Sequence, residues 1–318
     1  MGREGRSVVD SRQLRYFRQI VAHGSMSSAA RSLGVAQPSL SQLVRSLETT
    51  LGTELLVRSA RGISPTEAGE RLESYAVRIE RLLDDARTDV ANIGSSPAGR
   101  VTFGMPPSIC MALSIPMAET LRVEQPEIQF CVTEAMSGHL REWVMNGEID
   151  MAILYDNTGL GDCTSAFLLT EELWFYSAAD DWPFDTPPGE PVDLKDAVNT
   201  DLVLPSKRHG LRKFIDRAAQ AESRKPLVTL EMDSLPQIKS LVARGSGYTI
   251  ISPAAVLDLV EDGKIVGSPI RGPRLSRKIY LVRSSVNRIT AACRATEECC
   301  REVVDDLVTR GIWQANLA

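Results

Sequence analysis

Three glycines at intervals of 10 and 18 residues, Gly24, Gly34 and Gly52, limit what residues 14–52 of the chain can fold into. Between them, apolar residues recur every three or four positions, which is the spacing of one buried face of an α-helix. Glycine readily adopts the left-handed conformation that ends a helix. The pattern therefore predicts a compact unit of short helices over residues 14–23, 29–33 and 38–51.

The second and third predicted helices are joined by only a few residues around Gly34, which is typical of a helix-turn-helix. In that motif the second helix enters the major groove of DNA. Its apolar stripe would lie opposite short polar side chains that can bond base edges and phosphates. The DNA contacts predicted on these two helices are Ser28, Gln37, Ser39, Ser41, Gln42 and Arg45. The alternative is an ordinary helical hairpin whose polar face is only solvated.

The distribution of charge favours the DNA-binding interpretation. Residues 1–65 contain nine arginines, no lysine and four acidic residues, whereas the whole chain has a formal net charge of −5. The remainder is therefore strongly acidic, and only the N-terminal part is suited to a polyanion such as double-stranded DNA.

The segment after the third helix predicts a wing and a dimerisation helix. Residues 54–58 and 63–65 read as two short strands around a turn that carries Arg58 and Arg61. Such a hairpin can lie against the DNA backbone or in the minor groove. Thr66 then caps a long helix that reaches residue 93. A lone amphipathic helix of that length is expected to pair with its copy in a second chain.

This part of the chain closely resembles the DNA-binding head of the LysR-type transcriptional regulators, over the stretch LRYFRQIVAHGSMSSAARSLGVAQPSLSQLVRSLETTLGTELLVRSARGISPTEAGERL. The individual marks are Ala29-Ala30, Gln37-Pro38-Ser39-Leu40-Ser41, Leu47-Glu48, Gly52, Arg58 and Pro65-Thr66-Glu67-Ala68-Gly69. The chain departs from the family at Leu56, where Phe is usual, and at Gln42, where Arg is common. Residues 55–58, 65–67 and 152–155 are similar to the nitrogen-assimilation-control branch.

The resemblance implies roles for particular residues and partners. Gln37, Pro38 and Ser39 would face bases, Ser41 and Arg45 the DNA backbone, and Arg58 a wing phosphate or the minor groove. It also implies a homotetramer built as a dimer of dimers, an imperfect palindrome as the DNA site, a small-molecule effector, and RNA polymerase as a further partner.

The rest of the chain predicts an α/β effector-binding domain. Strand and helix patterns alternate from residue 101 to 155 and again from 202 to about 260, which indicates parallel sheets covered by helices. A strand near 279–282 and a helix over 287–309 would return to the first lobe. The resemblance implies the same two-lobed architecture, similar to periplasmic solute-binding proteins.

We therefore predict an α/β protein with an N-terminal winged helix-turn-helix. The expected divisions are a disordered extension (1–10), the DNA-binding domain (11–65), the linker helix (66–96) and the effector-binding domain (97–318). Within the last, lobe I comprises about 97–170 and 270–318, and lobe II about 171–269.

Polar residues at predicted helix starts are the candidate effector contacts, because unpaired N–H groups and the helix dipole favour anions there. They are Pro107, Ser108, Ser137, Gly138, Ser206, His209 and Ser234. We expect Ser108 and Ser137 together to hold the acidic group of the effector, a carboxylate or other anion. The alternatives are plain helix caps for the serines and a packed or surface imidazole for His209.

Other functions find less support in the sequence. The cysteines, which lack metal-ligand spacing, are expected to be free thiols, so we predict no metal and no cofactor: Cys110, Cys131, Cys163, Cys293, Cys299 and Cys300. An enzyme tethered to DNA is the main alternative, but His209 is the only histidine near the cleft and we predict no catalytic residues. An architectural DNA-binding protein would not need a cleft. No apolar run is long enough to span a membrane, so we expect a cytoplasmic protein.

Overall fold

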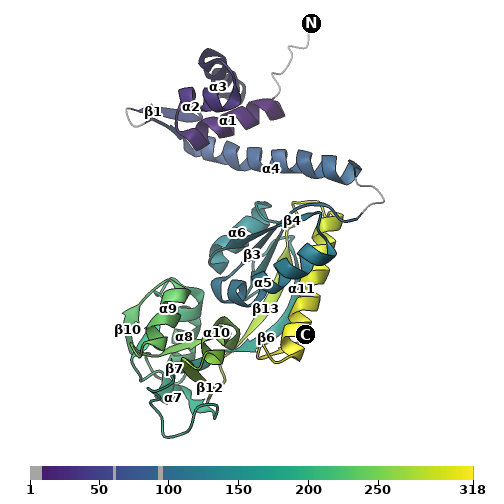
Figure 1. Ribbon diagram of the computed structural model, residues 1–318. Helices are drawn as coiled ribbons and strands as arrows, with labels where there is room; N and C mark the ends of the chain where they lie inside the picture. Colours follow the sequence, from purple (N-terminus) through teal and green to yellow (C-terminus); the bar gives the residue numbers. More distant parts are fainter. Residues whose placement is uncertain (1–8, 60–61, 92–95, 318) are drawn as a thin grey trace. The chain divides into compact units, whose positions relative to one another are not determined.

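The computed structural model describes residues 9–59, 62–91 and 96–317. The chain divides into two compact units, residues 1–93 and 94–318 (Figure 1). Most of the predicted N-terminal extension and Arg61 lie outside the described residues. No described helix is long and apolar enough to cross a membrane.

The first unit begins with helices α1 (Ser11–His23), α2 (Met26–Leu33) and α3 (Gln37–Leu51). Gly24, Gly34 and Gly52 follow them with φ angles of 59°, 65° and 70°, which confirms the predicted helix ends. Two helices start earlier than predicted because side chains upstream satisfy their free N–H groups. Asp10 accepts a hydrogen bond from the Gln13 N–H at the start of α1, and Ser25 accepts one from the Ser28 N–H at the start of α2.

The predicted wing and long helix are both present. Strands β1 (Leu56–Ser59) and β2 (Gly62–Pro65) pair antiparallel, and α4 (Glu67–Ala91) follows. The Thr66 hydroxyl accepts a hydrogen bond from the Gly69 N–H at 3.0 Å, which confirms it as the cap of α4. An ion pair between Arg18 and Glu80 joins α1 to α4. The exposed apolar side chains of α4 are Tyr75, Ile79, Leu82, Leu83 and Val90.

The first lobe of the second unit is built on a mixed sheet. Its strands in spatial order are β14 (Ala315–Leu317), β6 (Thr164–Glu172), β13 (Ser276–Arg283), β5 (Met151–Leu154), β3 (Gly99–Met105) and β4 (Ile128–Glu134). Strands β3, β4 and β5 run parallel as predicted, but β13 runs antiparallel to both β5 and β6. The parallel arrangement predicted for residues 101–155 is therefore confirmed, and the sheet is mixed because β6 leaves toward the second lobe and β13 returns from it.

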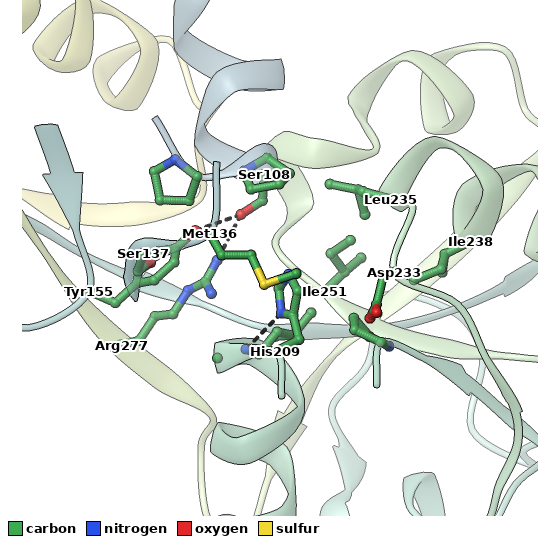
Figure 2. Close-up of a pocket in the computed structure, with 15 residues that line it drawn as sticks. Ser108, Met136, Ser137, Tyr155, His209, Asp233, Leu235, Ile238, Ile251 and Arg277 are labelled. Carbon is green, nitrogen blue, oxygen red and sulfur yellow. Dashed lines mark hydrogen bonds between the residues drawn. The ribbon is translucent and has the colours of Figure 1, made fainter. Parts of the chain in front are cut away.

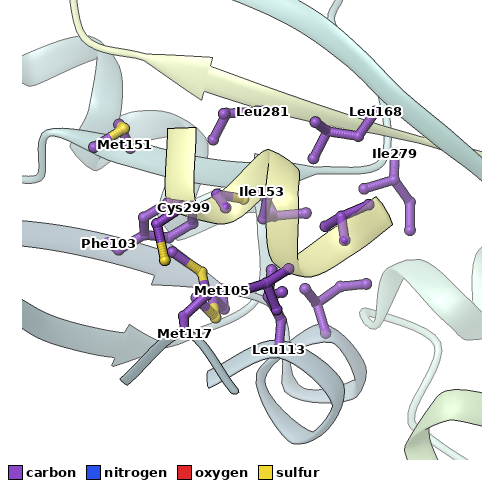
Figure 3. Close-up of a cluster of buried hydrophobic side chains, with 14 of the residues drawn as sticks. Phe103, Met105, Leu113, Met117, Met151, Ile153, Leu168, Ile279, Leu281 and Cys299 are labelled. Atoms are coloured by element: carbon purple, nitrogen blue, oxygen red, sulfur yellow. The ribbon is translucent and has the colours of Figure 1, made fainter. Parts of the chain in front are cut away.

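Helices of the first lobe cover this sheet. They are α5 (Pro107–Glu124), α6 (Ser137–Asn146) and α11 (Ala291–Thr309). Figure 3 shows side chains of β3, α5 and α11 meeting in one core, with Phe103, Leu113 and Met117 fully buried. Helix α11 begins at Ala291, later than the predicted residue 287, because the Thr290 hydroxyl accepts a hydrogen bond from the Cys293 N–H. This core holds in place the carboxyl ends of β3 and β4, after which α5 and α6 begin.

The second lobe has its own apolar core, centred on residues such as Phe175, Leu204 and Ile250. Its sheets have the strand orders β11-β7-β12-β8 and β10-β9, and only the pairs β10-β9 and β12-β8 are parallel. The strands of the predicted alternation are parallel where they pair, at β10-β9 and at the bridge between Leu202 and Tyr248, as predicted. Strand β7 lies outside that alternation and pairs antiparallel with β11 and β12. The elements are β7 (Trp174–Ala178), β8 (Val192–Asp193), α7 (Leu194–Ala197), β9 (Leu202–Leu204), α8 (Gly210–Ala221), β10 (Val228–Glu231), α9 (Leu235–Ala243), β11 (Thr249–Ile251), η1 (Pro253–Ala255), α10 (Leu257–Glu261) and β12 (Ile265–Arg271).

Candidate DNA-binding surface and effector site

Helix α3 places most of the predicted DNA contacts on one exposed face. Its inner face buries Leu40, Val44 and Leu47. The exposed predicted contacts on this helix are Gln37, Pro38, Ser39, Gln42 and Arg45, whereas Ser41 is half-buried. Within the described residues the exposed side chains make no hydrogen bond to the protein. They are therefore available to a ligand, as the major-groove face of a recognition helix must be.

The remaining predicted DNA contacts flank this face in the chain. Ser28 is half-buried in the first turn of α2, where its hydroxyl accepts a hydrogen bond from Arg31 at 3.4 Å. Arg58 is exposed on β1, and Arg61 lies in the turn outside the described residues. Arg31, an exposed cation beside Ser28, was not among the predicted contacts.

In the second unit, residues of both lobes line one pocket, here called the inner pocket (Figure 2). Its cavity is about 40 Å³. The predicted contacts that line it are Pro107, Ser108, Ser137 and His209. The lining does not include Gly138, Ser206 or Ser234. Ser206 does donate hydrogen bonds to Asp233, and Asp233 lines the pocket. The helix starts of α5, α6 and α8 therefore meet at this pocket.

Ser108 and Ser137 are not helix caps, so that alternative is wrong for both. The N-caps of α5 and α6 are Pro106 and Met136, and neither cap uses a side-chain hydrogen bond. Ser234 occupies the N-cap of α9 but likewise makes no capping bond. The hydroxyls of Ser108 and Ser137 are therefore not used to satisfy the helix ends.

His209 does cap a helix. Its Nδ1 accepts a hydrogen bond from the Leu211 N–H at 3.1 Å at the start of α8. Burial lowers the pKa of His209 below its usual range, and the nearby carboxylate of Asp233 only partly opposes this. An imidazole that accepts this bond at Nδ1 is neutral, in agreement with the lowered pKa. His209 therefore adds no positive charge to the pocket near pH 7.

Arg277 on β13 also lines the pocket and contacts Ser108, and it was not among the residues predicted from the sequence. Its Nη2 donates to the Ser108 hydroxyl at 3.1 Å, and its guanidinium lies 3.8 Å from the centre of the Tyr155 ring. The hydroxyls of Ser108 and Tyr155 are 2.8 Å apart (Figure 2). Burial raises the pKa of Tyr155, so its hydroxyl stays protonated and remains a hydrogen-bond donor.

The charge of Arg277 is balanced inside the protein. Its Nε donates to Glu171, a carboxylate on β6 that is fully buried. Glu171 also accepts hydrogen bonds from Ser252 of the second lobe and from Trp313 of the first, at 2.7 and 3.0 Å. Arg277 and Glu171 each lie on the buried face of their strand, two residues from a buried apolar side chain, such as Ile279 on β13. A charged residue on the apolar face of a strand was the signal that could have indicated this pair.

This arrangement can bind an anion. The Ser108 and Ser137 hydroxyls, the remaining N–H donors of Arg277 and the helix starts all offer hydrogen bonds to negatively charged oxygen. Within the described residues, no group of three or more His, Cys, Asp or Glu could hold a metal ion. His209 uses its Nδ1 as a helix cap, so that nitrogen is not available as a general base.

Comparison with known proteins agrees with both halves of this description. Residues 11–70 match the family "Bacterial regulatory helix-turn-helix protein, lysR family", and residues 94–305 match "LysR substrate binding domain". The nitrogen assimilation regulatory protein nac of Escherichia coli is 30% identical over 307 residues, covering 95% of this chain and 98% of that protein. The nac protein of Klebsiella aerogenes is also 30% identical, over 92% of this chain and 94% of its own. The resemblance to the nitrogen-assimilation-control branch is thereby confirmed.

Solved structures show the same fold. A full-length OxyR variant from Pseudomonas aeruginosa superimposes with a TM-score of 0.70 and 22% identity, covering 93% of this chain and 95% of that one. Full-length CbnR in complex with its target DNA also gives 0.70, with 18% identity, covering 93% and 100%. The matched families and the named relatives are transcription regulators and not enzymes. The chain belongs to the LysR family: it is a transcription regulator with an N-terminal helix-turn-helix DNA-binding domain and a C-terminal effector-binding domain.

Proposed function

We propose that this regulator responds to a small acidic effector whose anionic group is bound in the inner pocket. The observation that carries the proposal is the convergence of Ser108, Ser137 and Arg277 on one cavity between the lobes. A carboxylate there would accept hydrogen bonds from both hydroxyls and from the guanidinium. Charge-assisted hydrogen bonds of this kind are stronger than those between neutral groups.

The response is passed to DNA bound by the first unit. The exposed face of α3 reads bases through Gln37 and Ser39, Arg45 contacts the backbone, and the wing arginines Arg58 and Arg61 contact phosphates or the minor groove. Support comes from the exposure of this face and from the basic charge of residues 1–65.

Assembly follows from the same reasoning. The exposed apolar stripe of α4, which includes Tyr75 and Leu82, pairs with a second copy, and two such dimers form a tetramer. Paired heads then read an imperfect palindrome, with half-sites about one helical turn apart. The working divisions are 11–65 for DNA binding, 66–96 for the linker helix and 97–318 for the effector. The protein acts on chromosomal DNA in the cytoplasm, with RNA polymerase as a further partner.

Replacement of the pocket serines tests the effector site. Loss of a hydrogen bond to a charged group costs about 1.5–3 kcal/mol of binding, which is roughly a 10- to 150-fold loss of affinity. We therefore expect Ser108→Ala and Ser137→Ala to abolish the transcriptional response to the effector and to leave operator binding in place. The effector itself is first identified by a thermal-shift screen of small acids on the full-length protein.

The matched control is Ser114→Ala. This serine lies on the same helix as Ser108, but its hydroxyl donates to the Cys110 carbonyl and does not line the pocket. Wild-type effector affinity in both pocket variants would contradict the proposed site. Loss of affinity in Ser114→Ala as well would show that the helix, and not the pocket hydroxyl, is responsible.

A further inference from the structure

A second pocket, the outer groove, adjoins the inner pocket and has a different character. It has a volume of about 490 Å³ and shares Ser137, Tyr155, Gly210 and Arg277 with the inner pocket. Its remaining walls are formed by Asp156, Asn157, Lys213, Phe214, Arg217, Ser276, Lys278 and Tyr280. The shared residues therefore form a boundary that a ligand can touch from either side.

The outer groove has an excess of positive charge. Lys213 and Arg217, one turn apart on α8, and Lys278 on β13 are exposed cations. Among the described residues, none of the three has a carboxylate partner; Lys278 lies 6.0 Å from the centre of the Phe167 ring. The acidic residue in the lining, Asp156, already accepts hydrogen bonds from Arg141 and Thr158.

The inner pocket lacks this excess. The charge of Arg277 is paired with buried Glu171, and His209 is kept neutral. Asp233, on the opposite side, brings a negative charge. The inner pocket thus supplies hydrogen-bond donors with no net positive charge, whereas the outer groove supplies unpaired cations. The inner pocket itself therefore exerts little long-range electrostatic attraction on an anion. The unpaired cations of the outer groove can supply that attraction.

Size points in the same direction. A cavity of about 40 Å³ holds no more than a few water molecules, so it accommodates an acidic group and not a whole metabolite. The rest of the effector must extend past the boundary residues. Apolar and aromatic side chains, including Phe214 and Tyr280, line the groove and can contact a short carbon chain.

We propose that the effector is a small dianion, with one acidic group in the inner pocket and a second acidic group in the outer groove beside Lys213, Arg217 and Lys278. The second group is a carboxylate or a phosphate-like group, since both have the charge and the acceptor oxygens that these cations bind. This inference rests on the proposed function, because it presumes that the first acidic group lies at Ser108 and Ser137.

Matched pairs of acids test the proposal on the full-length protein by thermal shift. The probes are butanoate against succinate, pentanoate against glutarate, hexanoate against adipate, and 3-phosphonopropanoate for the phosphate-like case. Within the pair that fits, we expect the dianion to raise the melting temperature more than the monoanion at equal concentration and ionic strength. The phosphonate decides which kind of second acidic group is preferred.

A charge variant then locates the second site. Lys213→Gln with Arg217→Gln should weaken the fitting dianion about tenfold and its monoanion less than about twofold. The control is Arg224→Gln with Lys225→Gln, which removes the same charge from exposed residues that line neither pocket. Its affinity for the dianion should match the wild type.

Several results would overturn two-point binding: equal affinity for both members of every pair, no shift with any dianion, or the same loss in the control variant. Equal affinity of the wild type for a monoanion and its matched dianion, with binding of both lost in Ser108→Ala, would support the proposed function and overturn the dianion alone. A dianion that needs Lys213 and Arg217 but is unaffected by Ser108→Ala with Ser137→Ala would contradict the inner site, and with it the proposed function.

Discussion

Neutralising Glu171 should destabilise the effector unit more than any conservative change at its surface. Its carboxylate is fully buried and accepts hydrogen bonds from Arg277, Ser252 and Trp313. Glu171→Gln keeps the size of the side chain but leaves the guanidinium of Arg277 buried without a counter-charge. Breaking one partner of a buried ion pair in this way costs about 3–5 kcal/mol.

The neighbouring residue provides the control. Glu172 pairs with Arg274, whose side chain is 78% exposed, at 3.3 Å. An exposed pair of this kind contributes about 0.2–1 kcal/mol, so Glu172→Gln should have little effect on the free energy of unfolding. Both variants remove one carboxylate from the same strand, and only one of them leaves a buried charge.

Urea unfolding followed by tryptophan fluorescence measures the difference. All four tryptophans lie in the second unit, so the signal reports that unit, and Trp313 contacts Glu171 directly. A second variant, Glu171→Gln with Arg277→Met, removes both charges and should recover part of the lost stability. The reasoning is refuted if Glu171→Gln is no more destabilising than Glu172→Gln, or if removing Arg277 as well adds to the loss.

Three further predictions concern DNA binding, assembly and the thiols. Arg58→Ala should weaken DNA binding across sequences and lower the dependence of log affinity on log salt concentration by about one unit, whereas Gln37→Ala should relax base preference by about 1–3 kcal/mol. Filter binding at several salt concentrations measures both effects, and two variants that bind like the wild type would contradict the assignment. Light scattering should show a tetramer at micromolar concentration, and a monomer would exclude pairing through α4. Burial raises the pKa of Cys299 to about 11, so at pH 8 it stays a thiol. It should react with N-ethylmaleimide far more slowly than Cys131 in the folded protein, and mass spectrometry showing equal labelling would contradict its burial.

The winged helix-turn-helix could be predicted from the sequence because its signals are local. The glycine after each short helix and the hydroxyl of Thr66 act within a few residues of the helix ends that they determine. The exposed face of α3 follows from the same helical spacing that buries Leu40 and Leu47. No long-range contact was needed for these predictions.

The effector domain was harder to predict where long-range contacts decide the structure. Strands β6, β8, β12 and β14 were missed, and with them antiparallel pairs of both lobes, because strand pairing depends on partners far away in the chain. Ser108 and Ser137 could be placed at the pocket because they start helices after strands. Arg277 could not, since its partners Glu171 and Ser108 are 106 and 169 residues away.

Hydrogen exchange on the full-length protein, alone, with operator DNA and with the identified effector, tests the central claim most directly. Amides that a ligand orders or covers exchange more slowly, so the protected peptides locate each site. We predict that operator slows exchange in α3 and in the β1–β2 wing, and that effector slows it at the starts of α5, α6 and α8 and in β13 around Arg277. Effector protection confined to other parts of the chain, with none at Ser108 or Ser137, would contradict the account.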